Sequence, residues 1–439
     1  MTTATIELTA SQAEAGQKIQ DWYTDPDSQV FRLFGYAGTG KSTTANILIS
    51  QLGVRLPVYA AYTGKAAYVL RSKGAEGAST IHSLIYLPAM KARAKLDQLV
   101  KQLDTLLVDP LADPRDIQVL QRKIEIEKRK LESPDWHLKE QEESDLYGSD
   151  LLIIDEVSMV GERTALDLLS WGVKTLVLGD PAQLPPVDGA GYFIDAQPNH
   201  LLTEVLRSAL DSPVTRIATT IRAATIRDHD YGVTGLDGDS GRIDRLTVAD
   251  LLSVDQVLVG TNNTRWQTIH LLRALKGLHH PMPIAGDRIM VLANSGSAEV
   301  FNGQQFSVIN AHDVPDHDNR ICLDVLDDDG APRQLTCWRS GFAGLKGEQA
   351  AKRDGRGNVV AATYGQAVTV HKAQGSQWDS VLVVDESSVF ASIEGKEASR
   401  RGDPGAREAG HRAGQRWLYT AATRAAKQIR IIDRLRVQP

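Results

Sequence analysis

Short apolar runs alternate with turns and amphipathic segments along the first part of the chain. Residues 30–34 (VFRLF) form one such run, and a glycine-rich turn at 35–42 (GYAGTGKS) follows it directly. The segment 41–52 then repeats apolar positions at helical spacing, and an apolar run at 58–62 precedes another predicted helix, which begins within 63–72. This alternation of strand, loop and helix predicts a parallel sheet with helices on both faces.

The pattern changes twice farther along the chain. Residues 87–148 are rich in Lys, Glu, Gln and Leu, with apolar residues at three- and four-residue steps, which predicts two amphipathic helices that project as an arm. A plain solvated helical hairpin without a function explains this segment equally well. Residues 301–361 instead contain short strand-like pieces separated by Asp- and Gly-rich turns, a pattern typical of a small antiparallel β insertion of barrel type.

Strand patterns return outside these two segments, at 151–159 (LLIIDEVSM), 175–180 (TLVLGD), 257–261 (VLVGT) and 381–387 (VLVVDES). The sequence therefore predicts an α/β protein with two lobes, each interrupted by one insertion. The predicted boundaries are 1–86 and 149–210 for the first lobe, 87–148 for the helical insertion, 211–300 and 362–439 for the second lobe, and 301–361 for the β insertion.

Composition and charge narrow the class of protein. The chain has 439 residues, of which 42% are hydrophobic, and this length exceeds what one ordinary core accommodates. The net charge of -6 argues against attraction of the whole surface to nucleic acid. It permits a basic channel on an acidic body, and basic residues do gather at 396–436.

Export and membrane signals are missing from the sequence pattern. No run of about 18 apolar residues suggests a membrane span, and the first residues lack the basic-then-apolar pattern of a signal peptide. We therefore expect a cytoplasmic protein without a membrane partner. In a reducing compartment Cys322 and Cys337 are expected to be free thiols.

The turn at 35–42 fits the pattern G-x-x-x-x-G-K-[ST] between a strand and a helix, which predicts a phosphate-binding loop. Glycines let backbone N–H groups face phosphates, and the helix N-terminus adds its positive end. ATP and Mg²⁺ are the expected cofactors, with Lys41 reaching the β- and γ-phosphates and Ser42 holding the metal. The residues expected to surround the phosphates are Gly35, Ala37, Gly38, Thr39, Gly40, Lys41, Ser42 and Thr43.

Carboxylates and an amide follow the neighbouring strands. Asp155 is expected to orient Mg²⁺ together with Ser42, and Glu156 to polarise the attacking water. Gln183, in 179–186 (GDPAQLPP), is a candidate sensor of the γ-phosphate, because an amide both donates and accepts hydrogen bonds. Structural roles at strand ends remain the alternative explanation for these residues.

Nine segments in one order resemble superfamily 1 helicases, and within them the RecD-like branch that includes the phage Dda helicase. They are GYAGTGKS, AYTGKAA, STIHS, DEVSM, GDPAQLPPV, LTEVLRS, VLVGTNNTR, VTVHKAQGSQWD and WLYTAATRA. The resemblance covers most of the chain. It implies two RecA-like lobes that clamp ATP, an SH3-like β insertion in the second lobe, and ATP-driven 5′→3′ movement on single-stranded DNA with unwinding of forked duplexes.

The same resemblance implies roles for individual residues. Gln12 would contact adenine, and Arg207 and Arg424 would act as arginine fingers, because a guanidinium suits transition-state charge. Residues 374–376 and Tyr419 would link the DNA groove to the ATP site. The residues implied in contacts to the DNA backbone are Thr63, Lys65, Thr80 and His82 in the first lobe and Asn263, Thr369 and His371 in the second.

Several features of the sequence leave alternatives open. No clear aromatic-tipped hairpin marks the element that separates strands, and Tyr86 and Trp136 are the nearest candidates. Aromatic residues Tyr62, Tyr364 and Trp378 either stack on bases or pack in the core. Glu386 has no expected role beyond a turn. An RNA-directed enzyme, or an ATPase that grips a protein partner through the 87–148 arm, also fits the pattern.

Overall fold

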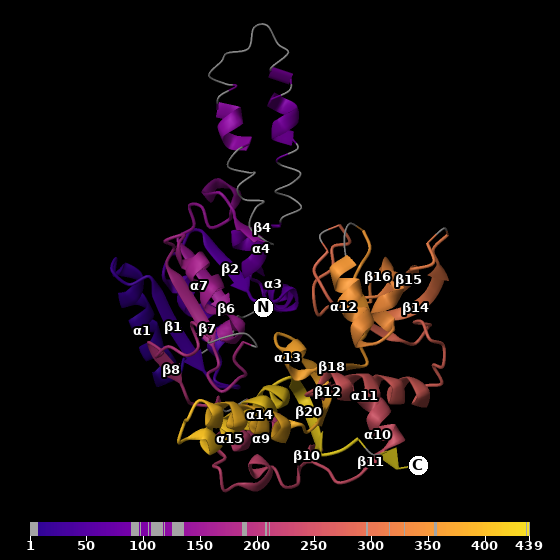
Figure 1. Ribbon diagram of the computed structural model, residues 1–439. Coiled ribbons are helices and arrows are strands. Elements are labelled where there is room, and N and C mark those ends of the chain that lie inside the picture. Colours follow the sequence, from indigo (N-terminus) through magenta and orange to yellow (C-terminus); the bar gives the residue numbers. More distant parts are fainter. Residues whose placement is uncertain are drawn as a thin grey trace, which may run out of the picture.

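The computed structural model describes residues 8–88, 96, 98–103, 105–106, 117, 119–124, 136–186, 191–206, 209, 211–295, 297–315, 317–328, 330–354, 358–435 and 437–438. Figure 1 shows two α/β lobes that lie next to each other. Two helical pieces, within 96–106 and 117–124, stand above the first lobe, and a small β structure stands above the second. This arrangement confirms the predicted α/β class with two lobes.

The first lobe is built on a six-stranded parallel sheet with the order β3-β2-β6-β7-β1-β8. Its strands are β1 (Val30–Gly35), β2 (Pro57–Ala61), β3 (Ser79–Thr80), β6 (Leu151–Asp155), β7 (Thr175–Gly179) and β8 (His200–Leu202). Its helices are α1 (Ala10–Thr24), α2 (Lys41–Gln51), α3 (Gly64–Ser72), α4 (Ile81–Ile85) and α7 (Glu162–Leu169).

Strand β6 shows why this sheet is covered on both faces. Leu151 and Ile153 pack with residues of α1 and α2, whereas Leu152 and Ile154 pack with residues of α4 and α7. Because side chains alternate along a strand, a continuous apolar run is buried only when both faces are covered. The first polar residue after this run is Asp155, so the packing of the strand delivers that carboxylate to the carboxyl edge of the sheet.

The second lobe has a six-stranded sheet with the order β18-β12-β19-β20-β10-β9, in which only β9 is antiparallel to its neighbour. Its strands are β9 (Leu236–Asp237), β10 (Ser240–Arg242), β12 (Gln256–Val259), β18 (Ala367–Thr369), β19 (Trp378–Val384) and β20 (Ala425–Ile432). The helices around it are α9 (Pro213–Ala223), α10 (Val248–Ser253), α11 (Asn262–Leu275), α13 (Val370–Ala373), α14 (Ser387–Arg400) and α15 (Ala406–Ala422). A short pair, β11 (Leu246–Thr247) and β21 (Val437–Gln438), flanks α10.

Helices α14 and α15 pack closely because glycines lie at their contact. A Cβ atom at Gly414 would lie 2.1 Å from the hydroxyl oxygen of Tyr231 and 2.8 Å from the carbonyl oxygen of Ser387. Only glycine allows this approach. The contact fixes α15, which ends at Ala422, just before the predicted arginine finger Arg424.

The β insertion is a five-stranded antiparallel sheet with the order β16-β15-β14-β13-β17. Its strands are β13 (Arg288–Val291), β14 (Gln305–Asp313), β15 (Arg320–Leu326), β16 (Pro332–Trp338) and β17 (Ala362–Tyr364), with helix α12 (Leu345–Asp354) beside them. The sheet therefore includes β13 and β17, which the sequence assigned to the second lobe. Phe306 and Leu323 of the insertion share one core with Val257 and Ile269 of that lobe.

A buried ion pair joins the insertion to the second lobe. Arg265 of α11 is 0% exposed and donates to the carboxylate of Glu348 in α12 at 2.5 Å. The same carboxylate oxygen accepts from the Thr363 hydroxyl at 2.6 Å. Removing one partner of such a pair leaves an uncompensated buried charge, so the pair fixes the position of α12 relative to α11.

The base of the arm differs from the prediction. Strands β4 (Tyr86–Pro88) and β5 (Trp136–Leu138) form an antiparallel ribbon there, where the sequence predicted a helix from residue 87. The predicted amphipathic helices are found within 96–106 and 117–124. The remainder of the arm, including the predicted junction near 111–116, lies outside the described residues.

Three other expectations concern single residues and membrane spans. Cys322 and the buried Cys337 are free thiols. Tyr364 is 1% exposed and packs against Trp266 and Phe342, so it belongs to the core and the stacking alternative for this residue is wrong. Among the described helices, none combines the length and apolar character needed to cross a bilayer.

Candidate functional site

The predicted phosphate-binding loop connects β1 to α2. Gly38 and Gly40 adopt φ angles of 78° and 77°, a conformation that favours glycine. A Cβ atom at Gly35 would lie 2.6 Å from the Thr39 hydroxyl oxygen, so this position has no room for a side chain. Helix α2 begins at Lys41 without a side-chain cap from any described residue. Its first N–H groups therefore point toward an anion site at the positive end of the helix.

The hydroxyl and carboxylate expected to hold the metal lie in contact. Ser42 donates its hydroxyl proton to Asp155 at 2.9 Å. Burial raises the pKa of Asp155, and the adjacent Glu156 charge raises it further, while Lys41 opposes both effects. Hydroxyl and carboxylate oxygens are ligands that suit Mg²⁺. The two residues, which come from different elements, therefore fit the cation expected here.

Residues from both lobes meet next to these groups. The Arg424 guanidinium of the second lobe is 5% exposed, and its Nη1 lies 3.9 Å from Oε1 of Glu156. The Gln183 side-chain amide has one orientation in which both its nitrogen and its oxygen form hydrogen bonds. In that orientation the nitrogen donates to Glu156 at 3.1 Å and the oxygen accepts from Arg424 at 3.3 Å. Lys41 donates to the carbonyl oxygen of Tyr36 at 3.2 Å. Lys41, Ser42, Asp155, Glu156, Gln183 and Arg424 line one cleft between the lobes.

Hydrogen bonds across the lobe interface surround this cleft. The Tyr419 hydroxyl donates to Asp180 at 2.7 Å and accepts from the Ala37 N–H of the phosphate loop at 2.9 Å. Burial raises the pKa of Tyr419 well above its usual value, and the Asp180 charge adds to this effect, so the phenol stays protonated. Gln374 of the second lobe also donates to the carbonyl oxygen of Leu184 at 3.2 Å. The residues predicted to link the two sites therefore do bridge the lobes.

Gln12 and Arg207 are the remaining nucleotide candidates. The Gln12 amide oxygen accepts from Thr9 N–H at 2.9 Å, and its nitrogen donates to the Thr39 carbonyl of the phosphate loop at 3.2 Å. This position beside the loop is consistent with an adenine contact, which stays a prediction. Arg207 lies outside the described residues. Its neighbour Leu206 donates its N–H to the Gly38 carbonyl at 3.0 Å.

Parallel strands bring the predicted DNA-backbone contacts of the first lobe together. Strands β2 and β3 pair with Ala61 opposite Thr80, so Thr80, the last residue of β3, lies beside the end of β2, which Thr63 follows by two residues. Each of these threonines caps a helix, α3 and α4 respectively. His82 packs against the rings of Tyr62 and Tyr86, and burial lowers its pKa.

The second lobe repeats this arrangement. Strands β12 and β18 pair with Val259 opposite Thr369, so Asn263, in the first turn of α11, and His371, in α13, follow adjacent strand ends. Gly375 approaches the first lobe, where a Cβ atom would lie 2.8 Å from the Thr63 hydroxyl oxygen. The structure therefore places both groups of predicted backbone contacts along one interface, although their contacts to DNA stay predictions.

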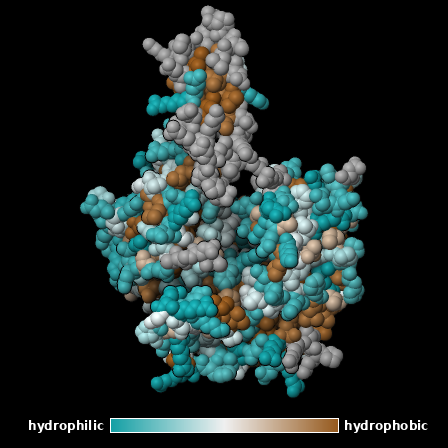
Figure 2. Space-filling view, viewed as in Figure 1, coloured by the Kyte–Doolittle hydropathy of each residue, from teal (hydrophilic) through white to brown (hydrophobic). Residues whose placement is uncertain are grey.

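The β insertion also reaches the first lobe at this interface. Lys65 pairs with the carboxylate of Asp328, in the turn between β15 and β16. The Phe301 side chain packs so closely over Gly64 that a Cβ atom there would lie 2.5 Å from the Phe301 Cβ. On the face shown in Figure 2, the surface of both lobes is mainly hydrophilic.

Glu386 is a residue whose role the sequence did not reveal. Its carboxylate accepts from the N–H groups of Gly260 and Thr261 at 2.6 and 2.9 Å and from the Thr264 hydroxyl at 2.7 Å. It therefore holds the start of α11, whose first turn contains Asn263. The sequence did contain a signal for Glu386. The segment 381–387 (VLVVDES) has the same form as 151–157 (LLIIDEV), an apolar strand followed by acidic residues.

Lys372 is a second residue that the sequence did not single out. It follows His371, and burial together with the Arg265 charge lowers its pKa to about 8. Glu348 opposes this shift, and Lys352 adds a further repulsion. A lysine with excess positive charge around it gains from an added phosphate, because the phosphate favours its charged form.

We therefore expect DNA binding to weaken as the pH rises from 7 through 9. A DNA phosphate bound beside Lys372 would raise the pKa of this lysine, so binding would take up a proton and would lose affinity where the free lysine is neutral. Fluorescence anisotropy with oligo-dT at constant ionic strength measures this change. The Lys372→Met variant should lose most of the pH dependence and Lys372→Arg should bind tightly throughout. An unchanged pH dependence in Lys372→Met would contradict the prediction that Lys372 contacts a DNA phosphate.

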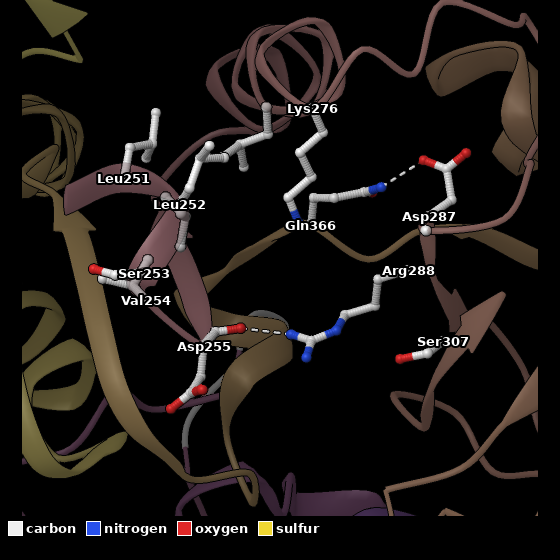
Figure 3. Close-up of a pocket in the computed structure, with 13 residues that line it drawn as sticks. Leu251, Leu252, Ser253, Val254, Asp255, Lys276, Asp287, Arg288, Ser307 and Gln366 are labelled. Carbon is white, nitrogen blue, oxygen red and sulfur yellow. Dashed lines mark hydrogen bonds between the residues drawn. The ribbon is translucent and has the colours of Figure 1, made fainter. Parts of the chain in front are cut away.

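Another cavity lies far from these residues, beside α10 at the edge of the second lobe (Figure 3). Its lining includes two cations, Lys276 and Arg288, and two acidic residues, Asp255 and Asp287. Arg288 donates to the Asp255 carbonyl, and Gln366 donates to Asp287 at 2.7 Å. The cavity contains none of the predicted site residues, and its Asp287 carboxylate already pairs with Arg273 of α11 at 2.8 Å.

The fold and site define a two-lobed protein with a P-loop for nucleotide phosphates. The family described as "AAA domain" matches residues 7–244, more than half of the chain. The chain belongs to this family.

One curated relative agrees with the resemblance to RecD-like helicases. The ATP-dependent RecD2 DNA helicase of Deinococcus radiodurans is 31% identical over 257 residues, which cover 54% of this chain and 32% of the relative. The chain thus spans about a third of the length of this curated relative. This relative confirms the predicted resemblance to the RecD-like branch of superfamily 1.

Solved structures of Pif1 helicases align over almost the whole chain at low similarity. A Pif1 structure on DNA unwinding at forked duplex DNA has a TM-score of 0.48 and 17% identity, and covers 99% of this chain and 95% of its own. Pif1 from Candida albicans has a TM-score of 0.47 and 16% identity, with 98% and 96% covered. Bacteroides Pif1 bound to single-stranded DNA has a TM-score of 0.46 and 17% identity, with 99% and 95% covered.

Proposed function

We propose that this chain is an ATP-dependent translocase on single-stranded DNA that unwinds forked duplexes in the 5′→3′ direction. The observation that carries the proposal is the meeting of Arg424 with Glu156 and Gln183, because it joins a guanidinium of one lobe to the catalytic carboxylate of the other. Such a composite site makes hydrolysis depend on how the lobes are placed. The polarity rests on the resemblance to the RecD-like branch.

The site residues support in-line hydrolysis of ATP. Glu156 accepts a proton from a water whose oxygen bonds to the γ-phosphorus as the bond to the bridging oxygen breaks, and ADP keeps that oxygen. Lys41 and Arg424 neutralise the charge that spreads over the phosphoryl oxygens. Ser42 and Asp155 would hold Mg²⁺, which supplies further charge neutralisation at the β- and γ-phosphates. The second product is hydrogen phosphate.

Coupling to DNA follows from the links between the lobes. Gln374 contacts the Leu184 carbonyl near the ATP site and lies three residues after His371 in the proposed groove. ATP draws Arg424 toward the γ-phosphate, and the loss of that phosphate releases it. Alternation between these two states changes the grip of each lobe in turn and moves the strand.

The test compares ATP hydrolysis and strand separation on matched substrates. We expect single-stranded DNA to stimulate hydrolysis, and a duplex with a 5′ single-stranded tail to be unwound more rapidly than one with a 3′ tail. Stronger stimulation by RNA of the same sequence would overturn the assignment to DNA. Stimulated hydrolysis without strand separation on any fork would instead favour a protein partner that binds the 87–148 arm. The predicted cytoplasmic location is proposed on sequence grounds alone.

A further inference from the structure

A second pocket lies at the lobe interface, on the other side of Tyr419 from the nucleotide cleft. Tyr36 and Ala182 of the first lobe and Arg222, Arg412 and Arg416 of the second line it, and we call it the arginine pocket. Its volume is about 150 Å³. Sites for drug-sized ligands hold roughly 300–1,000 Å³, so the arginine pocket suits a small ion better than a nucleotide.

The arginine pocket gathers three positive charges. None of its three guanidiniums forms an ion pair with a carboxylate from the described part of the chain. Arg412 and Arg416 are four residues apart on α15, a spacing that brings like charges together at a cost. Arg222 stacks on the Tyr36 ring, with its guanidinium carbon 3.9 Å from the ring centre. An anion between these side chains would relieve the repulsion.

The pocket is held in a defined geometry. Arg222 lies in the last turn of α9, and the Gln415 amide donates to the carbonyl oxygens of Ile221 and Ala224, both at 2.8 Å. Gln415 therefore ties α15 to the end of α9 and keeps the arginines of the two helices on one side. Arg222 and Arg416 are partly buried and Arg412 is exposed. Guanidinium donors gathered on one side in this way are an arrangement that recognises phosphate oxygens.

The wall between the arginine pocket and the nucleotide cleft is thin. Asp180 lines the cleft, whereas the next two residues, Pro181 and Ala182, line the pocket. Tyr419 lines the pocket and closes the boundary with its hydrogen bonds to Asp180 and to the Ala37 N–H. When the lobes part, these two bonds are what must break to connect the cavities.

We propose that the arginine pocket is a phosphate site that receives orthophosphate as it leaves the nucleotide cleft after hydrolysis. The source of the phosphate rests on the proposed function, whereas binding of phosphate rests on the pocket alone. Three guanidiniums make the pocket more positive than the cleft, whose lining combines three cations, Lys41, Lys73 and Arg424, with three carboxylates, Asp155, Glu156 and Asp180. That difference favours movement of a divalent anion from the cleft to the pocket.

The binding test uses inorganic phosphate and calorimetry at low ionic strength without nucleotide. The Lys41→Ala chain removes the main cation of the phosphate loop and should still bind one phosphate. Adding Arg412→Gln and Arg416→Gln should weaken that binding at least about tenfold, because two charged hydrogen-bond donors to the anion are lost. The matched control is Arg407→Gln, an exposed arginine of α15 outside the pocket, which should leave the affinity unchanged. No binding by Lys41→Ala, or equal loss in the control, overturns the proposal.

A second measurement tests the link to hydrolysis. With a fluorescent phosphate sensor, the chain with Arg412→Gln and Arg416→Gln should release phosphate several times more slowly than the chain with Arg407→Gln. Phosphate binding in calorimetry together with unaltered release overturns the link to the product. Failure of the proposed function is seen separately, as an absence of DNA-stimulated hydrolysis in the unaltered chain, and it leaves the calorimetric result in place.

Discussion

Replacement of Arg424 by Gln is expected to lower kcat for DNA-stimulated ATP hydrolysis by about 10³-fold or more, with a much smaller change in KM for ATP. Arg424 lies 3.9 Å from Glu156 and bonds to Gln183. Its charge therefore acts where negative charge develops in the transition state, and glutamine keeps the hydrogen-bonding capacity but removes that charge. Steady-state hydrolysis with saturating oligo-dT measures the effect.

The control for this variant is Lys427→Gln, which removes one positive charge from β20, three residues after Arg424. Lys427 is an exposed residue paired with Asp379, away from the cleft, so its loss should leave kcat unchanged. A fall of less than about tenfold for Arg424→Gln would remove this residue from the role of an arginine finger. It would also remove the main support for a site shared by the lobes.

Replacement of Lys41 by Ala is expected to lower kcat/KM for ATP by at least about 10²–10³-fold, because it removes the cation directed at the β- and γ-phosphates. The thermal unfolding midpoint should stay close to that of the unaltered chain. Lys41 is partly exposed, and its hydrogen bond goes to the Tyr36 carbonyl of the same loop. Hydrolysis and a thermal melt, measured side by side, separate loss of chemistry from loss of fold.

Lys18→Ala is a suitable control for the lysine substitution, since Lys18 lies on the surface of α1 and pairs with Glu14. Turnover by Lys41→Ala equal to that of the control would refute the assignment of the phosphate loop. Loss of turnover together with unfolding would leave the assignment of the phosphate loop without support. The Lys41→Arg variant, which keeps the charge, would then show whether the position of that charge matters for hydrolysis.

Local sequence patterns predicted the two sheets well because their strands are long apolar runs between clear turns. In β6, four successive apolar residues precede Asp155, and both burial and the position of the acid follow from that run. The ribbon of β4 and β5 was missed because each strand has three residues and the two are separated by the whole arm. Such pairing depends on distant partners rather than on local periodicity.

The site shows the same division between local and distant information. The phosphate loop and its helix form one continuous segment, so residues 35–43 could be predicted from spacing alone. Glu386 and Lys372 gain their roles from groups on other elements, such as the Gly260 N–H and the Arg265 charge. Tyr364 was considered for base stacking, but it is buried by the insertion, whose core the sequence could not place against α11.

The contact between Lys65 and Asp328 has a consequence for how salt acts on the protein. A DNA phosphate that binds Lys65 would compete with the Asp328 carboxylate of the same chain. This carboxylate is 52% exposed, and it would attract cations from solution once Lys65 no longer pairs with it. Counterions released from the nucleic acid are partly taken up again at Asp328. The slope of log affinity against log salt concentration therefore counts fewer contacts than the groove makes. Under the proposed function, the Asp328 carboxylate in the turn between β15 and β16 would compete with DNA phosphates for Lys65 and make DNA binding less sensitive to ionic strength.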